Sequence, residues 1–237
     1  MKLFKMAVAS AVVLSATTMV VADDKISEEM RDVEAFTKVK LEGSMDVEVK
    51  VGPAQSVKVV ADSDIIEYLR TRVHGGELEI DLKNHKGKRG FFNNIKKMQV
   101  IITVPTLESA QVHGSGDMFV KDVEIDRFDL EVHGSGDAVV ENAAVQRLRI
   151  DLHGSGDIEI DGSCDDVRVE LQGSGDVKAH KMQCKEADVT LQGSGDVGVY
   201  ASMAADVTVH GSGDVVVAGK PDQVRSKVRG SGDIHVR

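Results

Sequence analysis

The chain has 237 residues, of which 39 are acidic and 29 basic, and its formal net charge is −10. An acidic protein is a poor general partner for nucleic acid or an anionic membrane, because these polyanions bind basic surfaces. Trp is absent and aromatic residues make up 3% of the chain, which disfavours a large ligand pocket built on aromatic faces. The acidity also has a purely structural interpretation, since charge keeps an extended protein soluble.

Residues 1–22 have the features of a secretory signal peptide. Lys2 and Lys5 precede an apolar stretch, and the small residues that end at Ala22 predict cleavage after it. The apolar stretch is short for a span of about 20 residues and no second one follows, so we expect no transmembrane span. Cleavage removes two of the 29 basic residues and none of the 39 acidic ones, which leaves a net charge of −12. We expect an exported protein, in the periplasm or at the cell surface.

Residues 33–105 predict an irregular first part of the fold, which we expect to cap one end. Val39, Leu41, Val47, Val49 and Val51 alternate with charged or small residues, as in half-buried strands. Farther along, a polar Asp-Ser-Asp cap followed by spaced apolar residues predicts a short helix over about 63–73, which Gly75-Gly76 would end.

A basic loop at 83–97 contains Phe91 and Phe92. It has two interpretations. The loop is a contact patch for an anionic polymer or the envelope surface, or it is a solvated loop whose phenylalanines cover part of the core.

Residues 106–237 are dominated by the tetrapeptide Gly-Ser-Gly-Asp. It occurs seven times, at steps of 18 to 20 residues. The first glycines of the copies are Gly114, Gly134, Gly154, Gly173, Gly193, Gly211 and Gly230. An eighth, degenerate copy is Gly43-Ser44-Met45-Asp46. A constant period of this length indicates a solenoid, in which each repeat stacks on the next.

The residues around each copy alternate with a period of two. Positions at even offsets from the first glycine are apolar, whereas odd positions are mostly charged or polar. Each repeat is too short for a helical crossover and buries only about five apolar side chains, each worth roughly 1.5–3 kcal/mol. The sequence therefore predicts an all-β, right-handed parallel β-helix of about 20 residues per coil. The glycines are expected at tight inward corners, where a Cβ has no room.

Cys164 and Cys184 each lie nine residues before a first glycine. Stacking would place them in adjacent coils about 4.8 Å apart, which is within reach of a disulfide. An exported protein meets oxidising conditions, so we predict this disulfide. The alternative is a pair of reduced thiols in an apolar column.

Two polar columns are candidate metal sites. A row of aspartates could bind Ca²⁺ or could accept hydrogen bonds from the corner amides. These residues are Asp117, Asp137, Asp157, Asp176, Asp196 and Asp214. His113, His133 and His153 form a second row that could bind Zn²⁺. Repeat duplication alone would also produce such a row. We predict that both rows are structural and that the protein has no cofactor, with Ca²⁺ as the alternative.

The recurrence of Ser, His and Asp does not predict catalysis. An active site needs one distinctive constellation, whereas here almost every coil carries the same set. We therefore predict a non-enzymatic protein with no catalytic residues. A β-helix enzyme acting on polysaccharides and a purely structural envelope protein are the competing hypotheses. Asp233 is four residues from the last residue, so we also expect the last coil to lack a cover and to mediate self-association.

The chain resembles a bacterial exported family in five features: the signal peptide, the alternating 39–51 segment, the predicted helix at about 63–73, the alternating strand at 78–82 and the Gly-Ser-Gly-Asp repeats. That family is described as a putative auto-transporter adhesin, head GIN domain. The resemblance extends over about residues 33–237. It implies a right-handed β-helix in the cell envelope or outside the cell, and an adhesin-like module whose surface ligand is unknown and could be a glycan. It brings no catalytic residues.

Overall fold

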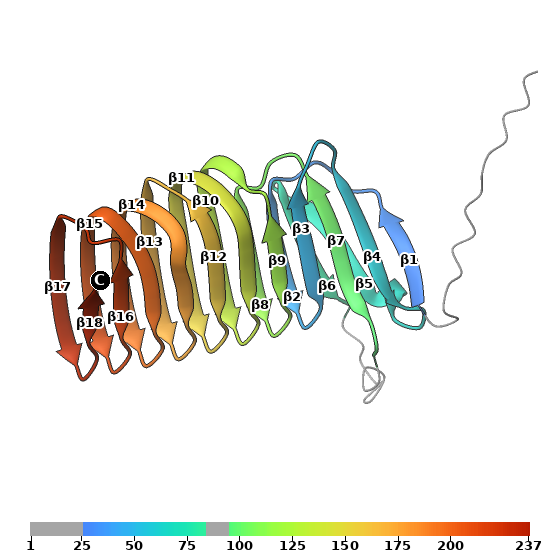
Figure 1. Ribbon diagram of the computed structural model, residues 1–237. Helices are drawn as coiled ribbons and strands as arrows, with labels where there is room; N and C mark the ends of the chain where they lie inside the picture. Colours follow the sequence, from blue (N-terminus) through green and yellow to red (C-terminus); the bar gives the residue numbers. More distant parts are fainter. Residues whose placement is uncertain (1–25, 84–94) are drawn as a thin grey trace, which may run out of the picture.

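The computed structural model describes residues 26–83 and 95–237, which form an all-β solenoid (Figure 1). About six turns of roughly 20 residues stack along one axis. The signal peptide, its cleavage site and most of the basic loop, with Phe91 and Phe92, lie outside the described residues. Within the part that is described, no helix is long and apolar enough to span a membrane.

Each coil contributes one strand that ends at the Gly-Ser-Gly-Asp corner and one that begins after it. We call the first set the pre-corner sheet and the second set the post-corner sheet. The pre-corner sheet runs in the order β6 (Glu77–Leu82), β2 (Lys38–Gly43), β8 (Ser109–Gly114), β10 (Glu124–Gly134), β11 (Ala138–Gly154), β13 (Asp166–Gly173), β14 (Val177–Gly193), β15 (Val197–Gly211) and β17 (Gln223–Gly230).

The post-corner sheet uses the first parts of the long strands β11, β14 and β15 together with shorter strands. Its order is β7 (Met98–Val104), β3 (Asp46–Val51), β9 (Met118–Lys121), β11, β12 (Ile158–Ser163), β14, β15, β16 (Val215–Ala218) and β18 (Ile234–Val236). All these neighbours are parallel. The long strands bend from one sheet into the other.

The register aligns equivalent residues of successive coils. Val132 pairs with Val112 on one side and Leu152 on the other. Even-offset side chains such as Phe128 and Leu130 are at most 1% exposed. The predicted apolar columns are therefore confirmed as one continuous core between the two sheets.

Corner glycines are required because the backbones of successive coils nearly touch. The first glycines have φ between +129° and +148°, a region that L-residues with a side chain rarely adopt. A Cβ at Gly134 would lie 2.2 Å from the carbonyl oxygen of Gly114, and one at Gly136 would lie 2.1 Å from that of Gly116. The same Gly114 oxygen accepts hydrogen bonds from the N–H groups of Ser135 (2.9 Å) and Gly136 (3.1 Å).

The degenerate corner stacks directly on the first regular one, although the chain makes a long excursion between them. Gly43 pairs with Gly114 in the β2–β8 register. Met45 replaces the second glycine there and is fully buried. The strand on its other side, β6, pairs with β2 only as far as Leu41, so no glycine corner of the described residues opposes Met45.

The predicted helix over about 63–73 is wrong. The segment contains one 3₁₀ turn, Ile66–Tyr68, and then β5 (Leu69–His74). β5 pairs antiparallel with β6. The spacing of Leu69 and Val73 fits a strand as well as a helix, because two residues four apart also lie on one face of a strand. Gly75 and Gly76, with φ of +59° and +79°, form the hairpin turn and do not end a helix.

Antiparallel strands make up the N-terminal end of the solenoid. β1 (Ile26–Arg31) pairs with β4 (Ser56–Asp62), which pairs with β7 at the end of the post-corner sheet. β5 extends the pre-corner sheet in the same way. Figure 1 shows these strands side by side at the blue end of the stack. They extend both sheets beyond the first coil.

Replacing Gly136 by Ala should lower the free energy of unfolding by at least about 2 kcal/mol. The added Cβ would overlap the Gly116 carbonyl oxygen, so two coils must separate and lose corner hydrogen bonds. Urea unfolding followed by circular dichroism measures the effect. Gly198→Ala is the matched control: there a Cβ would lie 3.6 Å from its nearest neighbour, and the change should be within about 1 kcal/mol of zero. Equal stability of the two variants would contradict the close approach of the corners.

Candidate functional site

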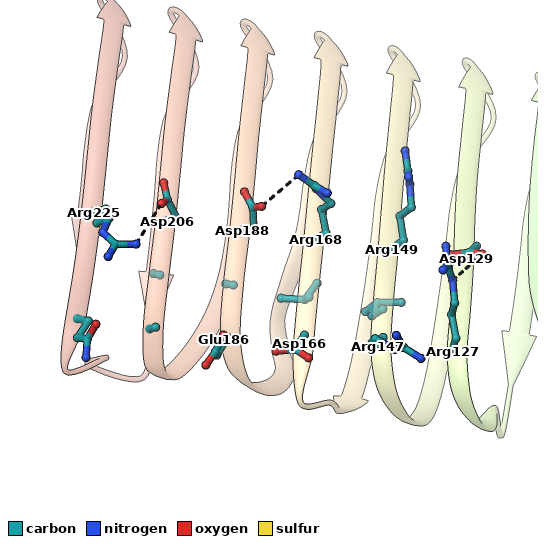
Figure 2. Close-up of a pocket in the computed structure, with 16 residues that line it drawn as sticks. Arg127, Asp129, Arg147, Arg149, Asp166, Arg168, Glu186, Asp188, Asp206 and Arg225 are labelled. Carbon is teal, nitrogen blue, oxygen red and sulfur yellow. Dashed lines mark hydrogen bonds and ion pairs between the residues drawn. The ribbon is translucent and has the colours of Figure 1, made fainter.

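The outer face of the pre-corner sheet carries many charged side chains, in columns that the strand alternation points away from the core. In each repeat, the residues seven and five positions before the first glycine form two such columns. These columns line a groove of about 570 Å³ that runs from β10 to β17. We call it the charged groove. Its charged residues are Arg127, Asp129, Arg147, Arg149, Asp166, Arg168, Glu186, Asp188, Asp206 and Arg225 (Figure 2).

Ion pairs in the charged groove link one coil to the next. Arg168 Nη2 lies 3.3 Å from Asp188 Oδ2, and Arg225 Nη1 lies 4.0 Å from Asp206 Oδ2. Both pairs are exposed, and such pairs contribute at most about 1 kcal/mol each. Their greater effect is to hold the side chains in place along the groove.

The cationic part of the charged groove lies over β10 and β11. Arg127 and Arg147 are neighbours in the register of these strands. Arg127 is paired with Asp129 (3.2 Å), whereas Arg147 has no carboxylate within 4.0 Å among the described residues. In the next two coils the same column holds Asp166 and Glu186. The column therefore changes from basic to acidic along the solenoid. In the part of the chain that the structure describes, Arg147 forms no ion pair with a carboxylate.

A second hollow of about 740 Å³ adjoins the charged groove toward the N-terminal end. We call it the histidine hollow, because His133 and His153 line it together with Glu131. Arg127, Asp129 and Arg149 line both cavities, so the two form one continuous polar depression. Its lining of charged and amide side chains is suited to a polar ligand.

The predicted histidine row is present. The ring centroids of His113 and His133 are 4.9 Å apart, and those of His133 and His153 are 4.5 Å apart and nearly parallel. Glu131 lies beside the first two, with Oε1 2.5 Å from His133 Nε2. Burial lowers the pKa of His113, with further lowering by Lys40 and His133, so the neutral imidazole is favoured there.

Sequence reasoning missed Glu131. It precedes His133 by two residues on β10, and alternation places both on the outer face. That spacing was a usable signal. The arginines of the charged groove were missed because their column changes sign and composition from coil to coil.

The aspartates of the repeats form a continuous hydrogen-bonded row. In each case the carboxylate oxygen Oδ1 accepts the backbone N–H of the next aspartate, at distances of 2.7 to 3.0 Å. The row joins Asp117, Asp137, Asp157, Asp176, Asp196, Asp214 and Asp233. These hydrogen bonds offset the repulsion between stacked carboxylates. Calcium binding by the row stays the alternative hypothesis.

Cys164 and Cys184 lie on adjacent coils with their Cα atoms 4.5 Å apart, and the structure joins them as a disulfide. Both are nearly buried, at 7% and 2% exposed. Their separation is at the short end of the range that disulfides adopt. The bond would close a loop between two coils that the hydrogen-bonded register already aligns.

These features define a class: a parallel β-solenoid with glycine corners and a charged outer face. Within this class, the family model described as "Putative auto-transporter adhesin, head GIN domain" matches residues 35–221. The chain belongs to this family, and the resemblance inferred from the repeats is confirmed. A comparison with curated proteins finds no match.

Solved structures share the fold over nearly the whole chain. A putative adhesin from Bacteroides fragilis is 22% identical, with a TM-score of 0.83 over 90% of this chain and 97% of that one. A putative lipid binding protein from Parabacteroides distasonis is 25% identical, with a TM-score of 0.71 over 91% and 98% of the two chains. A putative adhesin from the same species is 22% identical, with a TM-score of 0.70 over 91% and 98%.

Replacing Lys178 by Gln should lower the free energy of unfolding at pH 6 and should no longer lower it in acid. Lys178 Nζ donates to Asp157 Oδ2 (2.7 Å), which holds the pKa of that carboxyl below its usual value, and the N–H of Asp176 acts in the same direction. Because the pKa is lower in the folded state, the carboxylate stabilises the fold fully above its unfolded pKa of about 3.9. That stability is lost as the pH falls through the folded pKa.

The measurement is urea unfolding at pH 6 and pH 3, with the Asp157 carboxyl titration followed by NMR. Lys227→Gln, which removes an exposed lysine that has no carboxylate within 4.0 Å among the described residues, is the control and should have no effect at either pH. An equal loss at both pH values for Lys178→Gln would contradict the ion-pair account.

Mass spectrometry of the unreduced, alkylated protein should find no free thiol. Reduction should then lower the free energy of unfolding by about 3 kcal/mol, because the bond restricts a loop of 20 residues in the unfolded chain. The Cys164→Ala/Cys184→Ala double variant controls for the reductant and should be insensitive to it. Two alkylated cysteines in the unreduced protein would show that the pair is a dithiol.

Proposed function

We propose that this protein is an exported, non-enzymatic binding module of the adhesin-like type, and that its ligand lies along the charged groove. One observation carries the proposal: a groove that crosses the coils from β10 to β17 and is lined by arginines and carboxylates (Figure 2). Family membership and the similarity to structures named putative adhesins support a binding role.

The groove favours an elongated, polar ligand with anionic groups, such as an acidic glycan. Its side chains recur at the coil spacing of about 4.8 Å, so a polymer could contact several coils in turn. Arg147 supplies a guanidinium whose hydrogen-bond donors are not taken by a carboxylate of the described residues, and guanidinium pairs well with planar anions. The groove's carboxylates can accept hydrogen bonds from hydroxyl groups.

Lipid is a second ligand class, suggested by the name of the structure from Parabacteroides distasonis. The charged lining disfavours an acyl chain, because apolar ligands need apolar walls. A polysaccharide-acting enzyme and a purely structural envelope protein are the competing functions. The Ser and Asp of the repeat recur in all seven Gly-Ser-Gly-Asp copies, which favours a structural role for them over catalysis, because an active site needs one distinctive constellation.

Further features belong to the same proposal. We infer that residues 1–22 direct export and are removed after Ala22, and that the coils wind right-handed, the hand that parallel crossovers prefer. Division of the mature chain at about residue 105 also stays a prediction.

Self-association through the C-terminal coil stays a prediction as well. Val224 and Val228 on β17 are 40% and 42% exposed, which favours an apolar contact. Arg225, Lys227 and Arg229 alternate with them. A symmetric contact between two such strands would bring like charges together, so association is expected to strengthen with salt.

The test is binding to an array of acidic and neutral glycans, with Arg147→Ser compared with the wild type. The variant should weaken binding at least fivefold. Lys50→Ser is the matched control: it removes one exposed cation from β3 of the post-corner sheet and should leave binding within twofold.

The remaining outcomes separate the competing functions. Equal losses in the two variants would place the ligand outside the groove and indicate only a general charge effect. Release of shorter sugars would support the enzyme, and selective binding to phospholipid vesicles would support lipid. No binding to any of these probes would favour the structural protein.

A further inference from the structure

We propose that His113, Glu131 and His133 form a binding site for a divalent transition-metal ion of the Zn²⁺ type. One imidazole nitrogen from each histidine and one carboxylate oxygen lie within 4.8 Å of one another. Glu131 Oε1 is central, at 2.5 Å from His133 Nε2 and 3.8 Å from His113 Nε2. All three side chains are partly exposed, so an ion can reach them from solvent.

The backbone brings these three residues together without any loop. Glu131 and His133 are two residues apart on β10, so both point outward on the same face. His113 lies opposite His133 in the parallel β8–β10 register. A site built on paired strands is more precise than one built on loops, and here the coil-to-coil hydrogen bonds set the spacing.

His113 gives a second, independent reason for the site. Its Nε2 atom is buried and has no hydrogen-bond partner among the described residues, which is rare for a buried polar atom. The carboxylate of Glu131 is close enough to bond His133 but stands 3.8 Å from His113. An ion between the three residues would give the unpartnered nitrogen a partner.

The donor set selects the class of metal. Two imidazole nitrogens and one carboxylate oxygen are ligands that zinc accepts at about 2.0–2.2 Å, which places ligand atoms about 3.4 Å apart around a tetrahedral ion. Small rotations of the Glu131 and His113 side chains would reach that separation. Ca²⁺ and Mg²⁺ prefer sites made of oxygen alone, so this site and the aspartate row would bind different ions.

The proposal differs from a row of three histidine ligands. His153 stacks on His133 at a centroid distance of 4.5 Å, and it is not among the atoms that converge. Glu131 takes its place as the third ligand. Glu131 and His133 also line the histidine hollow, so a bound ion would stand at the wall of that hollow.

Isothermal titration of the metal-free full chain with Zn²⁺ should show one ion per chain. Glu131→Gln and His133→Gln should each raise the Kd at least tenfold. His153→Gln, and His210→Gln in a distant coil, are the controls and should stay within threefold. Gln is the natural residue of this column at Gln172 and Gln192, so the histidine variants are expected to fold.

Two further measurements keep the test decisive. Zn²⁺ should raise the Tm of the wild type and of His210→Gln but not of Glu131→Gln, and Ca²⁺ should not mimic it. In the wild type, NMR should show the ring signals of His113 and His133 shifting with Zn²⁺ while those of His210 do not. Absence of binding, binding that all variants retain, or a loss caused by His153→Gln but not by Glu131→Gln would each overturn the proposal.

Discussion

The structure depends on one contact: the backbones of successive corners lie so close that no side chain fits between them. The Gly114 carbonyl oxygen would lie only 2.2 Å from a Cβ at residue 134, and it accepts two N–H groups from the next coil. Most of the inward strand residues elsewhere are Val, Leu or Ile, and glycine at the corner is the geometric exception that lets the coils stack. Glycine costs conformational entropy, so its recurrence in every coil indicates that the close approach offsets that cost.

Once the corners are aligned, everything else on the chain is aligned with them. Even positions merge into one apolar core, and odd positions become columns on the two outer faces. Such columns concentrate like charges unless something offsets them. In the aspartate row, each carboxylate accepts a backbone N–H from the next coil. In the charged groove, Arg168 pairs with Asp188 and Arg225 with Asp206 across coils, whereas Arg147 has no carboxylate within 4.0 Å among the described residues. The same register that aligns the core side chains therefore also determines the surface available to ligands.

The period and the alternation were enough to predict the parallel coils, the inward glycines and the stacked cysteines. They failed where one pattern fits two structures. Leu69 and Val73 suit either a helix or a strand, and Gly75-Gly76 suits either a helix end or a hairpin turn. The contact of β2 with β8, across a long insertion, follows from topology that no local pattern encodes. The roles assigned to Glu131 and Arg147 follow from distances between side chains, which the sequence alone does not give.

A crystal structure of the mature protein would show directly whether the corners of successive coils form one row. The first glycines of all seven repeats, together with Gly43, should form one row with adjacent Cα atoms about 4.8 Å apart. Each of these glycine carbonyls except that of Gly230, in the last repeat, should accept N–H groups from the following coil. Corners displaced from a common line, or glycine Cα positions with open space where the next coil should be, would contradict this arrangement.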